Sequence, residues 1–234
     1  MGWRLASPGE PPQRVVMEPS SFAFVRRYEP RDRASVRQIC CDTADRGRSF
    51  EGFFHDREVF ADFLTGYYTD WEPEALWVAE HKDQVIGYVT GCLDADRYRR
   101  VMAWWIIPRG VLRGLSRGIL CSLETWRLLK AVIKTWQAGG LRVISFEKYP
   151  AHLHVNLRED FRGHGMGQRL VERFIQQVGE RGLPGLRASV RRDSHSACRF
   201  FERMGFAIIN RHRVVFPDGG ALREHETVVY GKAL

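Results

Sequence analysis

The sequence predicts an α/β fold with about seven strands. Seven short stretches carry the apolar patterns of strands, and segments whose apolar residues recur at helical spacing lie between them. One strand pattern runs through a glycine-rich turn directly into a helix pattern, a geometry that binds phosphate. Hydrophobic residues make up 44% and charged residues 27% of the 234 residues, as in ordinary globular domains.

The N-terminal part begins with a proline-rich stretch, residues 1–20, which predicts a mobile leader ahead of one domain at residues 21–234. Strand and helix patterns then follow one another. In chain order we expect a strand at residues 22–27, a helix opening at 29–32, a helix at 56–65, and two hairpin strands at 76–80 and 85–91.

Residues 94–150 form a basic, tryptophan-rich segment that we expect to be a helical insertion between the third and fourth strands. It holds 11 Lys or Arg and 4 Asp or Glu, so nearly all of the net charge of +8 belongs to it. Residues 98–107 predict a helix that Pro108 ends, and residues 123–136 predict a basic amphipathic helix.

The stretch at residues 151–178 carries the chemistry. Leu153, Val155 and Leu157 alternate with polar residues as in a strand, and a glycine-rich turn at 162–167 leads into a helix pattern. A P-loop would need Lys-Ser/Thr after its last glycine, and a dinucleotide fingerprint would need a third glycine where Leu170 stands. Both nucleotide motifs are therefore excluded.

The C-terminal part predicts a fifth strand at residues 185–190, a short helix at 195–204, and two final strands at 207–213 and 227–232. Residues 217–220, Pro-Asp-Gly-Gly, are expected to join the last two strands.

Two motifs together resemble the GCN5-related N-acetyltransferases (the GNAT superfamily). The first is Arg162-x-x-Gly165-x-Gly167, which resembles the superfamily's pyrophosphate-binding loop. The second is the strand–helix ending, in which Ala197, Phe200, Gly205 and Phe206 match, Ser194 replaces Asn, and Phe201 replaces Tyr. The resemblance implies a mixed, strongly twisted sheet that is split around an acetyl-CoA site and has helices on both faces. The long insertion before Tyr149-Pro150 also resembles the acetyltransferase-like domains related to the C-terminal part of O-GlcNAcases.

The resemblance implies that acetyl-CoA binds as a co-substrate at this strand and loop, without a metal. Backbone N–H groups at the helix N-terminus would hold the pyrophosphate, and the exposed strand edge would pair with pantetheine. A turn that only links a strand to a helix is the alternative. The residues expected to bind acetyl-CoA are Val155, Asn156, Leu157, Arg162, Gly163, His164, Gly165, Met166, Gly167, Gln168, Ser194 and Phe201.

Transfer of the acetyl group to an amine needs a base for the amine proton. His152 and His154 lie two residues apart and so share one face of the expected strand, and Glu147 is an alternative base. The histidines could instead be packed in the core. Because the pair is shifted by one residue relative to the His-x-His of arylalkylamine N-acetyltransferases, it could also face away from the site.

Phe201 stands where the superfamily commonly has the tyrosine that protonates the departing thiolate, and phenylalanine has no proton to give. The resemblance implies an N-acetyltransferase that acts directly on a primary amine of a small molecule or protein. Because Phe201 replaces the tyrosine, a non-catalytic acyl-CoA-binding module is the alternative. None of the five cysteines lies in the core motif, so no covalent enzyme intermediate is expected.

Other partners follow from the composition of the chain. The five cysteines have no metal spacing and no evident pairing, and no 18-residue apolar run or secretory signal is visible, which predicts a cytoplasmic protein. No nucleic-acid partner is expected. The insertion's tryptophans are expected to be buried against the sheet. The alternatives are weak contact with an anionic membrane, contact with a partner protein, and a lid over the acceptor site. A homodimer is left open.

Overall fold

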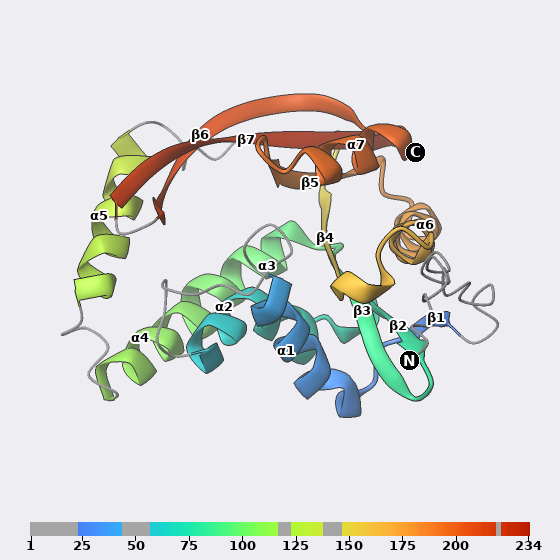
Figure 1. Ribbon diagram of the computed structural model, residues 1–234, viewed down its shortest axis with the longest axis horizontal. Helices are drawn as coiled ribbons and strands as arrows, with labels where there is room; N and C mark the ends of the chain where they lie inside the picture. The colour runs from blue at the N-terminus through green and yellow to red at the C-terminus, as the bar shows by residue number, and fades with distance from the viewer. Residues whose placement is uncertain (1–22, 44–56, 117–122, 138–146, 219–220) are drawn as a thin grey trace, which may run out of the picture.

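The computed structural model describes residues 23–43, 57–116, 123–137, 147–218 and 221–234. The leader at residues 1–20 and the segment at residues 44–56 lie outside the described residues. A seven-stranded sheet of order β1-β2-β3-β4-β5-β7-β6 runs through the molecule (Figure 1). All neighbouring strands are antiparallel except β4 and β5, which are parallel. The predicted mixed sheet of about seven strands is confirmed.

Two pairs of consecutive strands, β2–β3 and β6–β7, the helix pair α1–α2 and a run of three helices, α3 to α5, interrupt the alternation of strands and helices along the chain. The strands are β1 (Phe24–Arg27), β2 (Leu76–His81), β3 (Gln84–Cys92), β4 (Ala151–Leu157), β5 (Gly185–Arg191), β6 (Ala207–Asp218) and β7 (Ala221–Ala233). The helices are α1 (Arg33–Thr43), α2 (Arg57–Asp70), α3 (Ala95–Val101), α4 (Ile107–Ser116), α5 (Leu123–Gln137), α6 (Met166–Glu180) and α7 (His195–Arg203).

Each face of the sheet has its own core. On one face, α6 packs Leu170, Val171 and Phe174 onto residues such as Leu153, all of them at most 1% exposed. On the other face, α1 and α2 cover a second cluster that includes Tyr88 of β3. Because successive side chains of a strand point to opposite faces, β4 presents Leu153 to the α6 side and its neighbours His152 and His154 to the α1–α2 side.

The hairpin at the end of the sheet is much longer than predicted. Expected strands at residues 207–213 and 227–232 are parts of β6 and β7, which pair from Ala207↔Gly231 to Asp218↔Ala221. The far part of this ribbon lies beyond the sheet, and α5 packs on it there (Figure 1). The Val215 N–H donates to Thr135 Oγ1 over 2.9 Å and so ties the helix to the ribbon.

The helical insertion between β3 and β4 is confirmed, but the prediction that Pro108 ends its first helix is wrong. The chain continues from α3 through a π-helical turn, Met102–Ile106, into α4. In this turn the Ile107 N–H donates to Met102 O, five residues back, so the wider turn precedes Pro108. Pro108 is then near the start of a new helix, where a missing N–H costs little.

The prediction that the insertion buries its tryptophans is also wrong for three of the four. Trp104, Trp105 and Trp126 are 77%, 49% and 56% exposed. The side chain of Trp136 lies outside the described residues. Gly110 and Gly114, small residues on the opposite side of α4, occupy the buried positions instead.

Candidate acetyl-CoA site

The glycine-rich turn has the backbone conformation that only glycine adopts without strain. Gly163 and Gly165 have φ angles of +82° and +77°, in the left-handed region, and Gly165 is the N-cap of α6. A Cβ built on either glycine would meet no atom within 4 Å, and one on Gly167 would meet only the Phe200 ring at 3.8 Å. The space beside the loop is therefore open to a ligand.

The N-terminus of α6 offers several backbone donors to that space. The helix's first backbone hydrogen bond runs from the Arg169 N–H to Gly165 O over 3.1 Å. The N–H groups of Met166, Gly167 and Gln168 precede it and so lack an intrahelical acceptor. Together with the positive end of the helix dipole, they form a site that suits the pyrophosphate of acetyl-CoA.

The side chains around the turn differ in what they do. Arg162 donates from Nε and Nη2 to Leu157 O, at 3.0 and 2.9 Å, and thereby holds the end of β4 against the loop. Met166 is 3% exposed and anchors the first turn of α6 in the core. His164 is exposed, and Gln168 donates to Glu172 over 2.7 Å on the helix surface.

The strand before the turn separates from its neighbour. β4 and β5 are paired only from Ala151↔Leu186 to Leu153↔Ala188, while β4 stays paired with β3 as far as Leu157. Over His154 to Leu157, one edge of β4 therefore has no β5 partner in the described register. Val155, Asn156 and Leu157, predicted to pair with pantetheine, lie on this free edge and are half-buried.

The two predicted histidines lie together on the α1–α2 side of β4. Their rings are 6.1 Å apart between centroids, and His152 Nε2 is 2.9 Å from the hydroxyl of Tyr68 on α2. The His152 ring also meets Tyr98 edge-on at 5.0 Å. Asn156, two residues beyond His154, shares this side and donates to the Tyr88 hydroxyl over 2.8 Å.

Both histidines are held in the neutral form. The pKa of His152 lies well below its usual range because the ring is buried and because His154 and Arg187 repel its charged form. Desolvation lowers the pKa of His154. His152 is half-buried and engaged by Tyr68, whereas His154, although neighbouring atoms surround and desolvate its ring, keeps more of its surface accessible to solvent. His154 is therefore the histidine better placed to take a proton. Glu147 lies exposed in the turn before β4.

Sequence reasoning missed the tyrosines around this pair. Tyr68 is 3% exposed, and burial raises its pKa well above the usual value. Its position follows from α2 running to Asp70, past the predicted end at residue 65. Helical spacing from Phe60 and Leu64 to Tyr68 was the signal that could have extended the helix.

On α7, the two residues predicted to contribute to the site differ in burial. Ser194 is the N-cap, half-buried, and makes no capping hydrogen bond with its side chain. Phe201 is 5% exposed and packs on Phe206 and Tyr230, at centroid distances of 5.2 and 5.9 Å. Tyr230 in turn donates to Glu202 Oε1 over 2.9 Å. Contact of Ser194 and Phe201 with acetyl-CoA stays a prediction.

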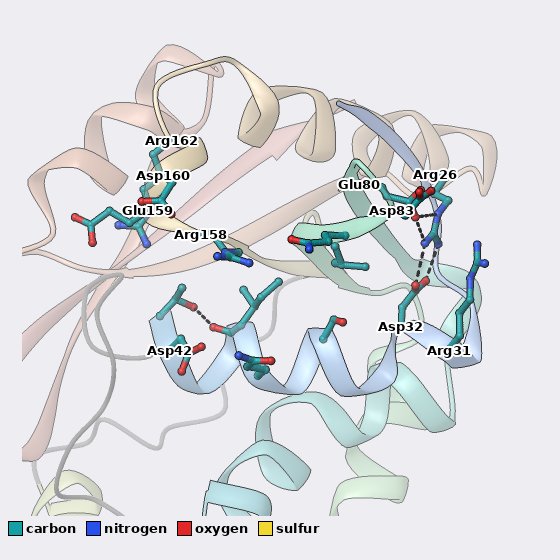
Figure 2. A pocket seen from close by; sticks show the side chains of 16 residues that line it. Arg26, Arg31, Asp32, Asp42, Glu80, Asp83, Arg158, Glu159, Asp160 and Arg162 are labelled. Atoms are coloured by element: carbon teal, nitrogen blue, oxygen red, sulfur yellow. Dashed lines mark hydrogen bonds and ion pairs between the residues drawn. The ribbon is translucent and has the colours of Figure 1, made fainter. Parts of the chain in front are cut away.

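A polar groove of about 720 Å³ lies next to the glycine loop, between α1, the β2–β3 hairpin and residues 158–162 (Figure 2). At its hairpin end Arg26 is bonded to Asp32 and Glu80, so those charges are already paired. Near the loop, Arg158 and Asp42 are among the charged residues that line it. The groove suits a polar molecule better than an apolar one.

Among the described residues, no group of three or more His, Cys, Asp and Glu side chains could hold a metal ion. No helix among them is long and apolar enough to cross a membrane.

Known acetyltransferases are similar to this chain in sequence and in fold. Residues 127–206 match the model of the acetyltransferase (GNAT) family. The crystal structure of SsHAT is 27% identical, covers 91% of this chain and 98% of its own, and has a TM-score of 0.65. The structure of yncA from Salmonella typhimurium, which contains its cofactor acetyl-CoA, is 14% identical over 91% of this chain and 94% of its own, with a TM-score of 0.57.

Among curated proteins, the mycothiol acetyltransferase of Corynebacterium aurimucosum is 37% identical over 60 residues. That match covers 26% of this chain and 20% of the relative, so the chain matches about a fifth of the relative's length. The family match, the fold and the two sequence motifs agree. Residues 127–206 therefore match the GNAT acetyltransferase family, and the fold of the described residues is similar to that of solved acetyltransferases.

Proposed function

We propose that the protein transfers an acetyl group from acetyl-CoA directly to a primary amine. The observation that carries this proposal is the junction of a free β4 edge with the open glycine turn at the N-terminus of α6. Acetyl-CoA supplies the acetyl group as a thioester, which the amine attacks and from which the CoA thiolate departs. The backbone N–H groups of Met166, Gly167 and Gln168 would bind its pyrophosphate.

His154 is the residue we assign as general base. An ammonium group has no lone pair, so the acceptor has to lose a proton before or during attack. The imidazole of His154 is exposed on the face of β4 that also carries His152 and Asn156, and its lowered pKa keeps it neutral near pH 7. His152 would position it, because its own Nε2 is engaged by Tyr68.

The first test is a calorimetric titration with acetyl-CoA and then CoA. Gly167→Val adds a side chain to open space without requiring a strained backbone, so it should fold normally and lose binding by at least tenfold. Gly179→Val is the matched control, because Gly179 lies in the same helix and has no atom within 4 Å of a built Cβ, while Gly167 has only the Phe200 ring, at an ordinary contact distance of 3.8 Å. Equal binding by both variants would contradict the assignment of the loop.

The second test follows release of the CoA thiol in the presence of a panel of primary amines. We expect His154→Gln to lower kcat by about 10²–10⁴-fold, the usual contribution of a general base. His195→Gln, on exposed α7 surface, is the control. In the wild type, kcat/KM should rise with pH through a pKa below the usual ~6.5 of histidine, because only the neutral ring accepts a proton. That limb should be absent in His154→Gln.

A non-catalytic acyl-CoA-binding module is the second candidate, and Phe201 is the observation that favours it. The side chain that replaces the usual tyrosine is buried among aromatic rings and has no hydroxyl. Tight acetyl-CoA binding without turnover of any amine would support this module. Turnover that Phe201→Tyr increases would support the enzyme.

We place the protein in the cytoplasm. Cys40, Cys41, Cys92 and Cys198 are all buried free thiols, which suits a reducing compartment. Sedimentation analysis of the purified protein tests whether it forms a homodimer.

A further inference from the structure

Helix α4 turns its large apolar side chains to solvent. Leu112 is 63% exposed, Leu115 is 53% exposed and Val111 is 46% exposed, and Trp104 in the preceding π-helical turn is 77% exposed. Scattered exposed apolar residues are normal on a protein surface, but here they recur along one side of one helix. This side of α4 is an unpartnered apolar stripe.

Packing on the other side of α4 fixes this orientation. Gly110 and Gly114, one turn apart, are buried toward α2. A Cβ built on Gly110 would come within 2.6 Å of the Phe63 ring, so no larger residue fits there without a shift. Rotation of α4 that brought a leucine to the position of Gly110 would therefore clash with Phe63, so the leucines stay on the solvent side.

Helix α5 repeats the arrangement. Ala131 and Thr135, also one turn apart, are buried, and Thr135 is bonded to the β6 backbone. The apolar residues Trp126, Leu129 and Ile133 are 56%, 47% and 45% exposed. Both helices lie at the same end of the molecule, the left end in Figure 1.

The segment that carries the two stripes is rich in positive charge, and one of its arginines, Arg113 of α4, is paired with Asp62 of α2. Residues 97–146 contain ten Lys or Arg and a single acidic residue, Glu124. On α4, Arg109 lies over the Trp105 ring at 5.5 Å, and on α5, Lys130 and Lys134 are exposed next to the apolar residues. A partner that binds these stripes therefore needs an apolar surface next to negative charges.

We propose that α4 and α5 dock the protein on the surface of an anionic phospholipid membrane. Tryptophan and leucine side chains would enter the boundary between headgroups and acyl chains, and the flanking arginines and lysines would meet lipid phosphates. A second copy of the chain fits less well, because joining two such stripes would bring two sets of positive charges together. The protein lies on the membrane in this arrangement and does not span it.

The test is flotation of the full-length protein with vesicles of phosphatidylcholine alone or with about 30% phosphatidylserine. We expect binding to the anionic vesicles only, a blue shift of tryptophan fluorescence on binding, and loss of binding at high salt. The double variant Trp104→Ser/Leu112→Ser and the variant Lys130→Gln/Lys134→Gln should each bind at least tenfold more weakly.

Matched controls separate docking from folding. Phe24→Ser changes an apolar residue on β1 that is 49% exposed, and Arg203→Gln removes an exposed charge on α7, so neither should alter flotation. Every variant should bind acetyl-CoA as the wild type does. Absence of flotation, or equal flotation of all variants, would overturn the proposal. So would a dimer in sedimentation analysis that Trp104→Ser/Leu112→Ser dissociates, which would assign the stripes to a second copy.

Discussion

Helices α6 and α4 are both strongly amphipathic, but they face opposite ways. Helix α6 buries Leu170 and Phe174 completely against the sheet and leaves its charged residues in water. Helix α4 buries Gly110 and Gly114 and leaves Leu112 and Leu115 in water. Apolar periodicity thus identifies a helix face without saying what covers it. In α6 the cover is this protein's own sheet, and in α4 the two glycines let α2 approach closely on the other side.

The largest loss of stability in the comparison of the two helices is expected from Phe174→Ala in α6. Phe174 is 0% exposed and lies against Gly91 of β3, so its removal leaves a cavity in the middle of the core. We expect a loss of about 3–5 kcal/mol in the free energy of unfolding, measured by urea denaturation. A loss below about 1 kcal/mol would mean that the α6 face is not the central core.

A smaller effect is expected from Gly110→Ala, compared with Gly66→Ala in α2. Alanine at Gly66 meets no atom within 4 Å and should stabilise the helix by up to about 1 kcal/mol. Alanine at Gly110 meets the Phe63 ring, so we expect this variant to be less stable than Gly66→Ala by about 1–3 kcal/mol. Equal thermal stability of the two variants would break the claim that close approach orients α4.

The smallest effect on stability is expected from Leu112→Ser. The side chain is 63% exposed, so its loss removes little buried area, and the free energy of unfolding should change by no more than about 0.5 kcal/mol. A loss of 2 kcal/mol or more, on the scale of a buried leucine, would show that the stripe is covered within the protein itself. The α4 stripe would then be a buried face like that of α6.

Acidification tests the histidine pair separately. Because the folded-state pKa values of His152 and His154 lie below the unfolded value of ~6.5, the unfolded chain binds more protons once the pH falls below that value. Stability should therefore decrease as the pH falls from about 6.5, and less steeply in His152→Asn than in the wild type. An unchanged slope in denaturation at several pH values would show that His152 is not held neutral.

Much of the fold followed from local patterns in the sequence. The alternation of β4 and the helical spacing of α6 are short-range features, and Gly163 and Gly165 marked a backbone that few other residues adopt. The path of the chain at Pro108 could not be predicted in the same way, because proline is compatible with a helix once a π-helical turn precedes it.

The candidate site was only partly visible in the sequence. The strand pattern put His152 and His154 on one face, but which face depends on pairing with β3, where Thr90 is the partner of His154. The neighbour Tyr68 comes from a helix 84 residues earlier in the chain, and such a contact has no local signature. The exposure of Trp104 was predicted wrongly, because the spacing of apolar residues does not say on which side a helix is covered.

The short pairing between β4 and β5 has a mechanical consequence. Three residue pairs join two larger units, β1 to β4 on one side and β5, β7 and β6 on the other, each of which is extensively paired within itself. Local opening should begin along this seam, because it has the fewest backbone hydrogen bonds to break. In hydrogen–deuterium exchange, the β4 amides that face the seam should exchange early, and a ligand that bridges the two units should slow them more than any others.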